Sequence, residues 1–301
     1  MFDAYVSHHA RLRPDAPAIV TPGGVIGFAR LDVDVARTSA LLRQLEAGAD
    51  RPVAVDVQDL YLHWVVTLAL ARLGVPSAPA ADGDCPLRVA DHAGAAASYL
   101  IGEREIAAML SGPVPVLPRP KVAPEGLGRI MLSSGTTGAE KRIALSWAAI
   151  DAGIRNVPVA YGAASGPWLM ATGVQTILGF VLTLGCWGLG APVLMGLGGP
   201  LPAAEVLATR PGLIAMTPGQ LARFLDELPA GHPRHPVRVV TGGGPVPAQL
   251  LARARGPDRR RPERVRRIRV RRGRGRVGRG ARSLAVGGRL RPAGGDRRDR
   301  R

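Results

Sequence analysis

Apolar and polar positions alternate with two different periods along the first part of the chain. Within residues 2–13 and 30–46, apolar side chains recur at helical spacing, which predicts two amphipathic helices. Between them, the apolar runs 18–20 and 25–28 flank a Pro-Gly-Gly turn. This pattern is typical of two strands paired as a β-hairpin. The chain therefore opens with helix, hairpin, helix.

Further on, short continuous apolar runs alternate with helical patterns. Residues 52–57 form a strand of the buried parallel kind, and the apolar helix 60–73 leads to another strand at 75–79. Later, the strand 213–216 precedes a helix that Thr217 and Pro218 open as cap and first turn. Strands alternating with helices predict an α/β fold.

Residues 80–120 carry the weakest pattern, and four prolines between 113 and 120 predict an extended connector there. The same region contains potential metal ligands, whose irregular spacing argues against a metal site. We expect them to be solvated loop residues: Asp82, Asp84, Asp91 and His92.

The uncharged stretch 156–204 raises the question of a membrane span, which needs about 20 apolar residues. Glycine and proline divide this stretch into short pieces, and no basic cluster flanks it. The pattern favours a buried helix and strand over a membrane span.

The segment between Ile130 and Trp147 holds the main group of candidate ligand-binding residues. An apolar triplet runs into six small or hydroxylated residues and then into Lys141, which predicts strand, tight loop, strand. Glycines let a backbone approach a ligand, while N–H groups, hydroxyls and a lysine can hold phosphate oxygens. The spacing excludes a Walker A loop. Composition alone leaves open a Ser/Thr/Gly-rich hairpin with a solvated lysine.

The order of the residues decides between these alternatives. The candidate cradle consists of Ser133, Ser134, Gly135, Thr136, Thr137, Gly138 and Lys141. It closely resembles the phosphate-binding signature Thr-Ser-Gly-Thr-Thr-Gly-x-Pro-Lys-Gly of the adenylate-forming superfamily, which includes acyl-CoA synthetases, aryl-CoA ligases and peptide-synthetase adenylation domains. The sequence departs from it at Glu140 and Arg142, where the family usually has Pro and Gly, and neither replaces a phosphate donor. Residues 13–17, 27–32 and 71–76 resemble the family's N-terminal landmarks.

A second signature lies about a hundred residues later. The strand 237–241 delivers its backbone to a glycine run before a helix at 247–255, which outlines a mononucleotide site. The run consists of Gly242, Gly243, Gly244 and Pro245. It resembles the family's Ser-Gly-Gly-Ala-Pro-Leu segment, whose backbone packs against adenine.

Two positions depart from the family at the acyl pocket. Trp147, at the start of a helix expected over 144–154, stands where the family usually has His. Thr176 aligns with the family's aromatic or His residue on the pocket floor, so the usual ring is missing. A plain core threonine is an equal interpretation of Thr176.

Charge separates the end of the chain from the rest. The 301 residues carry a net charge of +17, and residues 256–301 contain 19 Arg, four acidic residues and no Lys. Three interpretations remain open: an arginine-rich arm that binds RNA or DNA, a solvated spacer, or an out-of-frame translation of a GC-rich gene. The absence of Lys and aromatics favours the third, and all three predict that the segment does not fold.

The resemblance implies a fold and an activity. Residues 1–257 would be the N-terminal large-domain portion of an adenylate-forming enzyme, with stacked α/β subdomains, and residues 258–301 a disordered Arg-rich tail. In the implied reaction, which uses Mg²⁺, a small carboxylic acid attacks the α-phosphate of ATP and gives an acyl-adenylate and pyrophosphate. The acyl group then forms a thioester with CoA or the phosphopantetheine of a carrier protein, and AMP leaves. The cradle would grip the β- and γ-phosphates, and the glycine run would line the adenine.

The resemblance also has limits. The family's aromatic-Gly-x-Thr-Glu segment, ribose-binding Asp and lysine-bearing C-terminal domain do not occur here, so no catalytic residue is assigned and low activity is expected. The alternative function is nucleic-acid binding through the tail. Two cysteines, Cys85 and Cys186, give no disulfide framework, and the N-terminus lacks an apolar signal region. A cytoplasmic protein that does not enter the membrane is expected.

Overall fold

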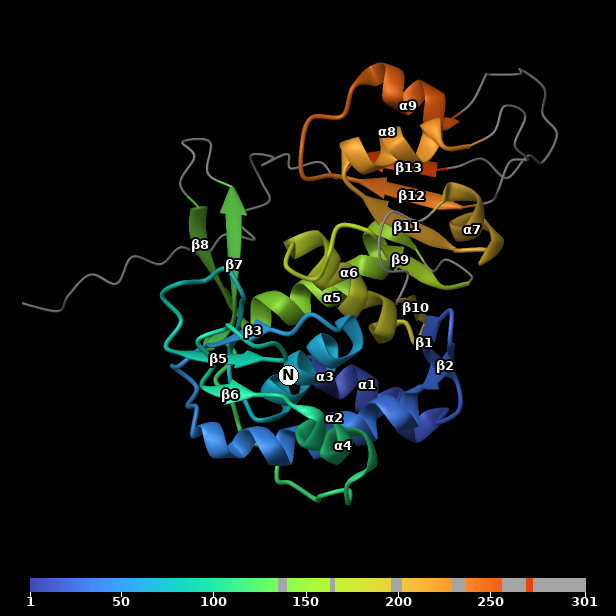
Figure 1. Ribbon diagram of the computed structural model, residues 1–301. Helices are drawn as coiled ribbons and strands as arrows, with labels where there is room; N and C mark the ends of the chain where they lie inside the picture. Colours follow the sequence, from blue (N-terminus) through green and yellow to red (C-terminus); the bar gives the residue numbers. More distant parts are fainter. Residues whose placement is uncertain (135–139, 163–165, 196–201, 229–236, 256–268, 273–301) are drawn as a thin grey trace, which may run out of the picture.

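The computed structural model describes residues 1–134, 140–162, 166–195, 202–228, 237–255 and 269–272. These residues form two β-sheets with helices packed on and between them (Figure 1). The seven-stranded sheet is called sheet A, and the six-stranded one is called sheet B. The expected α/β architecture is confirmed.

Sheet B is parallel apart from one hairpin at its edge. Its strands in spatial order are β6 (Tyr99–Leu100), β5 (Leu87–Ala90), β3 (Val53–Asp56), β4 (Ser77–Pro79), β7 (Leu127–Ser134) and β8 (Glu140–Ser146). The accompanying helices are α2 (Phe28–Leu42) with its terminal 3-10 turn η1 (Arg43–Leu45), α3 (Leu60–Arg72) and α4 (Glu103–Ser111). The antiparallel β7–β8 pair lets β7 extend beyond the parallel strands.

Sheet A is parallel from β13 to β1 and closes with the β1–β2 hairpin. Its strands in spatial order are β13 (Arg269–Arg272), β12 (Arg238–Thr241), β11 (Leu213–Met216), β9 (Trp168–Met170), β10 (Val193–Leu194), β1 (Pro17–Thr21) and β2 (Gly24–Gly27). The remaining helices are α1 (Asp3–Leu12), α5 (Trp147–Tyr161), α6 (Ile177–Gly188), α7 (Ala203–Ala208), α8 (Pro218–Asp226) and α9 (Ala248–Arg255).

Strand alternation assigns the two faces of sheet A to different helices. Val240 belongs to the large core that includes residues of α6, whereas its neighbour Val239 packs with Leu221 of α8 and Leu250 of α9. Successive residues of a strand point to opposite faces, so a nearly continuous apolar strand serves two layers. This is why β11 reads as an unbroken apolar run.

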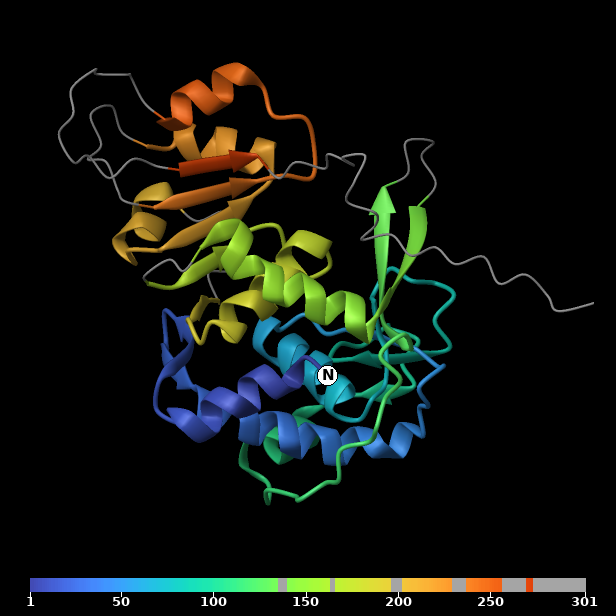
Figure 2. The same ribbon diagram turned by 180° about the vertical axis from the view of Figure 1, so that it is seen from behind.

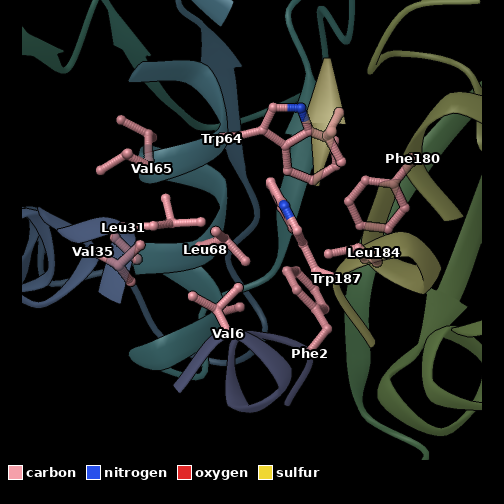
Figure 3. Packing of buried hydrophobic residues seen from close by; sticks show 14 of the residues in the cluster. Phe2, Val6, Leu31, Val35, Trp64, Val65, Leu68, Phe180, Leu184 and Trp187 are labelled. Atoms are coloured by element: carbon pink, nitrogen blue, oxygen red, sulfur yellow. The ribbon is translucent and has the colours of Figure 1, made fainter. Parts of the chain in front are cut away.

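Aromatic rings join the two halves of the molecule. Figure 3 shows Trp64 of α3 beside Phe180 and Trp187 of α6. Trp64 stacks on Phe180 with centroids 5.7 Å apart and meets Trp187 edge-on at 5.1 Å. Phe2 contacts the Phe180 ring edge-on at 5.5 Å. Seen from behind, α5 and α6 lie between sheet A and the helices of the N-terminal half (Figure 2), so one core spans both sheets.

Several sequence predictions are confirmed. The N-terminal hairpin forms, β11 spans Leu213–Met216, and α8 begins at Pro218 after the cap Thr217. Gln220 N donates to Thr217 Oγ1 at 3.2 Å, and Thr217 N donates to Gln220 Oε1 at 2.8 Å. The apolar stretch after residue 156 forms buried strands and helix α6, and none of the described helices has the length and apolarity of a membrane span.

Two predictions need correction. The expected connector at 80–120 contains β5, β6 and α4, because strands of two to four residues show no readable period. The helix expected from residue 144 begins at Trp147, because residues 140–146 form β8 and Ser146 Oγ caps the helix. Of the Arg-rich tail the structure describes only residues 269–272, which form β13 and pair in parallel with β12; the rest of the tail lies outside the described residues.

Candidate functional site

The β7–β8 hairpin carries the first candidate segment. Ser133 pairs with Lys141 and Ser134 with Glu140, so these four residues form the open end of the ladder. The predicted cradle residues Gly135, Thr136, Thr137 and Gly138 lie outside the described residues. The side chain of Lys141 is exposed. The structure therefore brings Ser133, Ser134 and Lys141 together at the two ends of the loop.

Arg142 anchors this hairpin to the loop after β4. Its Nη2 lies 3.0 Å from Oδ2 of Asp82, and its Nη1 lies 3.4 Å from Oδ2 of Asp84. Asp82 is only 2% exposed, so the expectation of a solvated loop residue is wrong for it. Buried carboxylates occur where a charged partner satisfies them. Arg142, which stands where the family usually has Gly, thus holds the hairpin to the loop after β4.

Asp91 and His92, which were also expected to be solvated loop residues, have partners as well. The carboxylate of Asp91 accepts hydrogen bonds from the N–H groups of Gln58 and Asp59, just before α3. His92 Nε2 lies 3.3 Å from Asp56 Oδ1, and this contact raises the pKa of His92. Within the described part of the chain, no group of three or more His, Cys, Asp or Glu side chains could hold a metal ion.

The glycine run forms the second candidate segment. Gly242 follows β12, and Gly243 has φ +84°, a conformation that L side chains rarely adopt. A Cβ at Gly243 or Gly244 would meet no atom within 4 Å, whereas one at Gly242 would come 3.7 Å from Leu178 Cδ2 of α6. Pro245 is exposed. The run therefore offers open backbone beside the start of α6.

Three parallel strands end at the same edge as this run. The register pairs Met216 with Thr241 and Ala215 with Met170, so β9, β11 and β12 finish nearly level. Gln220 Nε2 donates to the carbonyl oxygen of Ala171 at 2.7 Å, which ties the end of β9 to α8. Ligands of open α/β sheets bind outside the carboxyl ends of the strands. The glycine run lies at that edge of sheet A.

The start of α6 borders the edge as well. Thr176 is exposed and caps α6, because its Oγ1 accepts from Gly179 N and donates to Gly173 O, both at 3.0 Å. The alternative of a core threonine is therefore wrong. A Cβ at Gly179 would lie 2.0 Å from Gly173 O, so the loop before α6 packs closely only against glycine.

Trp147, at the position where the family usually has His, is part of the core. The side chain is 5% exposed, and its ring lies 5.7 Å from that of Phe2. It therefore packs the start of α5 against Phe2, the residue before α1, inside the core.

The two candidate segments lie on the same side of the molecule. Figures 1 and 2 both show the carboxyl ends of β11 and β12 directed toward the side on which the β7–β8 hairpin stands. The hairpin belongs to sheet B and the glycine run to sheet A, so a ligand held by both would bridge the two sheets.

Sequence analysis missed Arg129, a fully buried arginine in β7. Its guanidinium carbon lies 4.3 Å from the centre of the Phe180 ring, and its Nη1 donates to Ser77 Oγ at 2.9 Å. The available signal was a single cation inside an otherwise apolar strand, four residues before Ser133.

Comparison with known proteins gives a fold. No family model matches the sequence, and no curated protein matches it. Solved structures do match: VinN in complex with L-aspartate superposes with a TM-score of 0.71 at 17% identity, covering 85% of this chain and 72% of VinN. The chain has the fold of the adenylate-forming enzymes.

Other adenylate-forming neighbours support the same assignment. The o-succinylbenzoate CoA synthetase MenE from Bacillus subtilis, in complex with AMP, gives a TM-score of 0.67 at 17% identity over 82% of this chain and 55% of MenE. The N-terminal subdomain of NpsA from Klebsiella oxytoca, with 3-hydroxyanthranilyl-AMSN, gives 0.68 at 15% identity over 84% and 68%. The chain thus resembles the N-terminal part of adenylate-forming enzymes, among them an acid–thiol ligase.

Proposed function

We propose that this chain binds ATP and activates a small carboxylic acid as an acyl-adenylate. The supporting observation is the placement of two independent signatures, at the open end of the β7–β8 hairpin and at the carboxyl edge of sheet A, on one side of an adenylate-forming fold. Residues 1–257 form the activating portion, and residues 258–301 lie outside it.

The cradle residues take the triphosphate in this proposal. Backbone N–H groups and hydroxyls of the loop donate to the β- and γ-phosphates, and Lys141 adds a charge-assisted contact. The loop residues are Ser133, Ser134, Gly135, Thr136, Thr137 and Gly138. These donors offset negative charge that develops on the phosphates during adenylation.

The glycine run takes the nucleoside. Gly243 and Gly244 have no neighbour in the direction of a missing Cβ, so a flat base can approach the backbone closely. Gly242 and Pro245 border the same surface. Adenine packing at this point leaves the triphosphate directed toward the hairpin.

The cofactor assignments are ATP, Mg²⁺ and a thiol acceptor. The described residues contain no metal-ligand cluster that fits Mg²⁺, so the metal ion would arrive with the nucleotide phosphates. CoA or a carrier-protein phosphopantetheine would accept the acyl group in a second step. We expect low turnover, because the family's Glu and catalytic Lys segments do not occur in these 301 residues.

Photolabelling tests the nucleoside placement. The protein is irradiated with 8-azido-ATP, digested and mapped by mass spectrometry, with excess ATP as competitor. The proposal expects ATP-protected label on peptides that contain residues 242–245. Label confined to other peptides, or label that ATP does not displace, contradicts it. Acid-dependent pyrophosphate exchange then tests adenylation itself.

A second candidate function rests on the Arg-rich segment alone. A chain ending at residue 272 retains β13 and removes the last 29 residues. If the segment binds nucleic acid, this truncation weakens a salt-sensitive shift of RNA or DNA, because ten of the 19 arginines are removed, and deletion of residues 258–301 abolishes it. If the chain acts only in acid activation, nucleotide binding by the truncated and full-length proteins is the same.

A further inference from the structure

Arg129 is a buried cation that has no anionic partner among the described residues. Its side chain has no exposed surface, and burial lowers its pKa to about 9, which leaves it charged at neutral pH. Its Nη1 and Nε donate to neutral atoms, Ser77 Oγ at 2.9 Å and Met131 Sδ at 3.1 Å. Among the described residues no carboxylate lies within ion-pair distance, and Nη2 is buried without a hydrogen-bond partner. Arginine does not escape such a situation readily by losing its proton.

Two further buried polar atoms without partners lie on the facing helix α3. His63 is 2% exposed, and its Nε2 has no hydrogen-bond partner. Thr67 is 0% exposed, and its Oγ1 has none either. The two residues are four positions apart in α3 and therefore share a helix face. Native proteins leave few buried polar atoms unpaired, so these atoms call for a common explanation.

The surroundings place Arg129 and His63 in one region of the core, and the helical spacing puts Thr67 beside His63. Arg129 lies against Phe180, and Phe180 stacks on Trp64, the neighbour of His63 in α3. Ser77, which Arg129 contacts, also pairs with it across the β4–β7 ladder. The charge of Arg129 contributes to the low pKa of His63, second only to burial, and such an effect requires proximity.

We propose that Arg129, His63 and Thr67 form an internal binding site for a small monovalent anion with the chemistry of chloride. The guanidinium supplies the compensating charge and a free N–H, and the threonine hydroxyl supplies a second donor. A water molecule would satisfy the hydrogen bonds but would leave the buried charge uncompensated. An anion satisfies both requirements.

Anion binding is coupled to a proton at His63. Nδ1 lies 3.1 Å from the carbonyl oxygen of Val57, which can only accept, so Nδ1 carries the proton in neutral His63 and Nε2 carries a lone pair. An anion beside Nε2 favours protonation there and raises the pKa of His63 from about 4. The charged groups that act on this ring are Arg129 of β7, Asp56 of β3 and Asp91 after β5. Affinity therefore rises as the pH falls, by at most about tenfold per pH unit for one proton.

In this site the bound anion would contact residues of both β7 and α3 and so link the two elements. Because β7 continues into Ser133 and Ser134, the anion would stabilise the strand that carries the candidate cradle. The site itself does not depend on the proposed activity, since it lies in the core between α3, β4 and β7.

Bromide diffraction tests the site directly on the unaltered protein. A crystal grown in sodium bromide is measured at the bromine absorption edge, and the proposal expects an anomalous peak within hydrogen-bond distance of Arg129 Nη2. Thermal unfolding supplies the solution readout: at equal ionic strength, chloride raises Tm relative to gluconate by about 2–4 °C at roughly five times its Kd. Absence of bromide at Arg129 together with equal Tm values in the two salts overturns the proposal.

Variants separate the roles of the two residues. Arg129→Met abolishes the chloride-dependent shift, while Arg155→Met, which removes an exposed cation, keeps it. His63→Gln retains the chloride effect and loses its pH dependence, so this variant decides the question if Arg129→Met fails to fold. A chloride effect in His63→Gln that still strengthens as the pH falls contradicts the assigned proton coupling.

Discussion

Arg142 and Asp82 join the β7–β8 hairpin to the body of sheet B through an ion pair of 3.0 Å. The arginine is 39% exposed and the aspartate 2%, so solvent weakens the pair on one side only. Asp84 contributes a longer contact from a side chain that is 77% exposed. The pair fixes β8 directly beside Lys141, which places a structural constraint next to the candidate phosphate contact.

Removal of the buried partner should loosen the hairpin. Asp82→Ala is expected to lower the free energy of unfolding by about 1–2 kcal/mol, less than for a fully buried pair because Arg142 reaches solvent. Asp84→Ala, at an exposed position, should cost less than about 0.5 kcal/mol. Urea unfolding of both variants measures the difference. Equal costs for the two substitutions would mean that the ion pair with Asp82 has no special weight.

The contact between Gly179 and Gly173 predicts an intolerant position at the start of α6. A Cβ at residue 179 would lie 2.0 Å from Gly173 O, so Gly179→Ala forces the loop before α6 outward and should cost about 1–3 kcal/mol. Gly219→Ala in α8 serves as the control, because a Cβ there meets nothing within 4 Å. Thermal unfolding compares the two. A Gly179→Ala protein as stable as Gly219→Ala would contradict the described packing.

His63 predicts a loss of stability in acid. Burial and Arg129 lower its pKa from 6.5 to about 4 in the folded protein, while Asp56 and Asp91 act in the opposite direction. The unfolded chain therefore takes up a proton first, so stability is full above pH 6.5 and declines as the pH falls toward 4, by about 3 kcal/mol in total.

The measurement is urea unfolding between pH 7 and pH 4 in gluconate, which avoids anion binding. His63→Gln should remove this component of the decline and leave the rest. His8→Gln is the matched control at a histidine in exposed surroundings. An unchanged acid decline in His63→Gln would show that His63 does not carry it.

Sequence patterns predicted the features that depend on neighbouring residues. The helix start at Thr217 and Pro218 and the N-terminal hairpin were found because their signals lie within a few positions of each other. The two ligand signatures also depend on local order, and the structure puts their described ends on one side of the molecule.

The features that the sequence did not predict depend on contacts between residues far apart in the chain. Asp82 read as a solvated residue because its partner Arg142 lies 60 positions away. For Arg129 the sequence offered only a cation within an apolar run, and the contacts with Ser77 and Phe180 that accompany its burial lie far away in the sequence. The strands β5 and β6 were too short for a period. β5 forms along the parallel edge of β3, and β6 pairs with β5.

The most direct test of the nucleotide site uses the chain's two lysines, Lys121 and Lys141. Both are exposed, so substitution of either should leave the fold intact, but only Lys141 belongs to the candidate cradle. Calorimetric titration with Mg·ATP is performed on the unaltered protein, Lys141→Met and Lys121→Met. The account predicts that Lys141→Met weakens ATP binding by about 10- to 100-fold through loss of one charge-assisted contact, and that Lys121→Met binds like the unaltered protein. Equal affinities in all three proteins, or no ATP binding by the unaltered chain, would contradict the proposed nucleotide site.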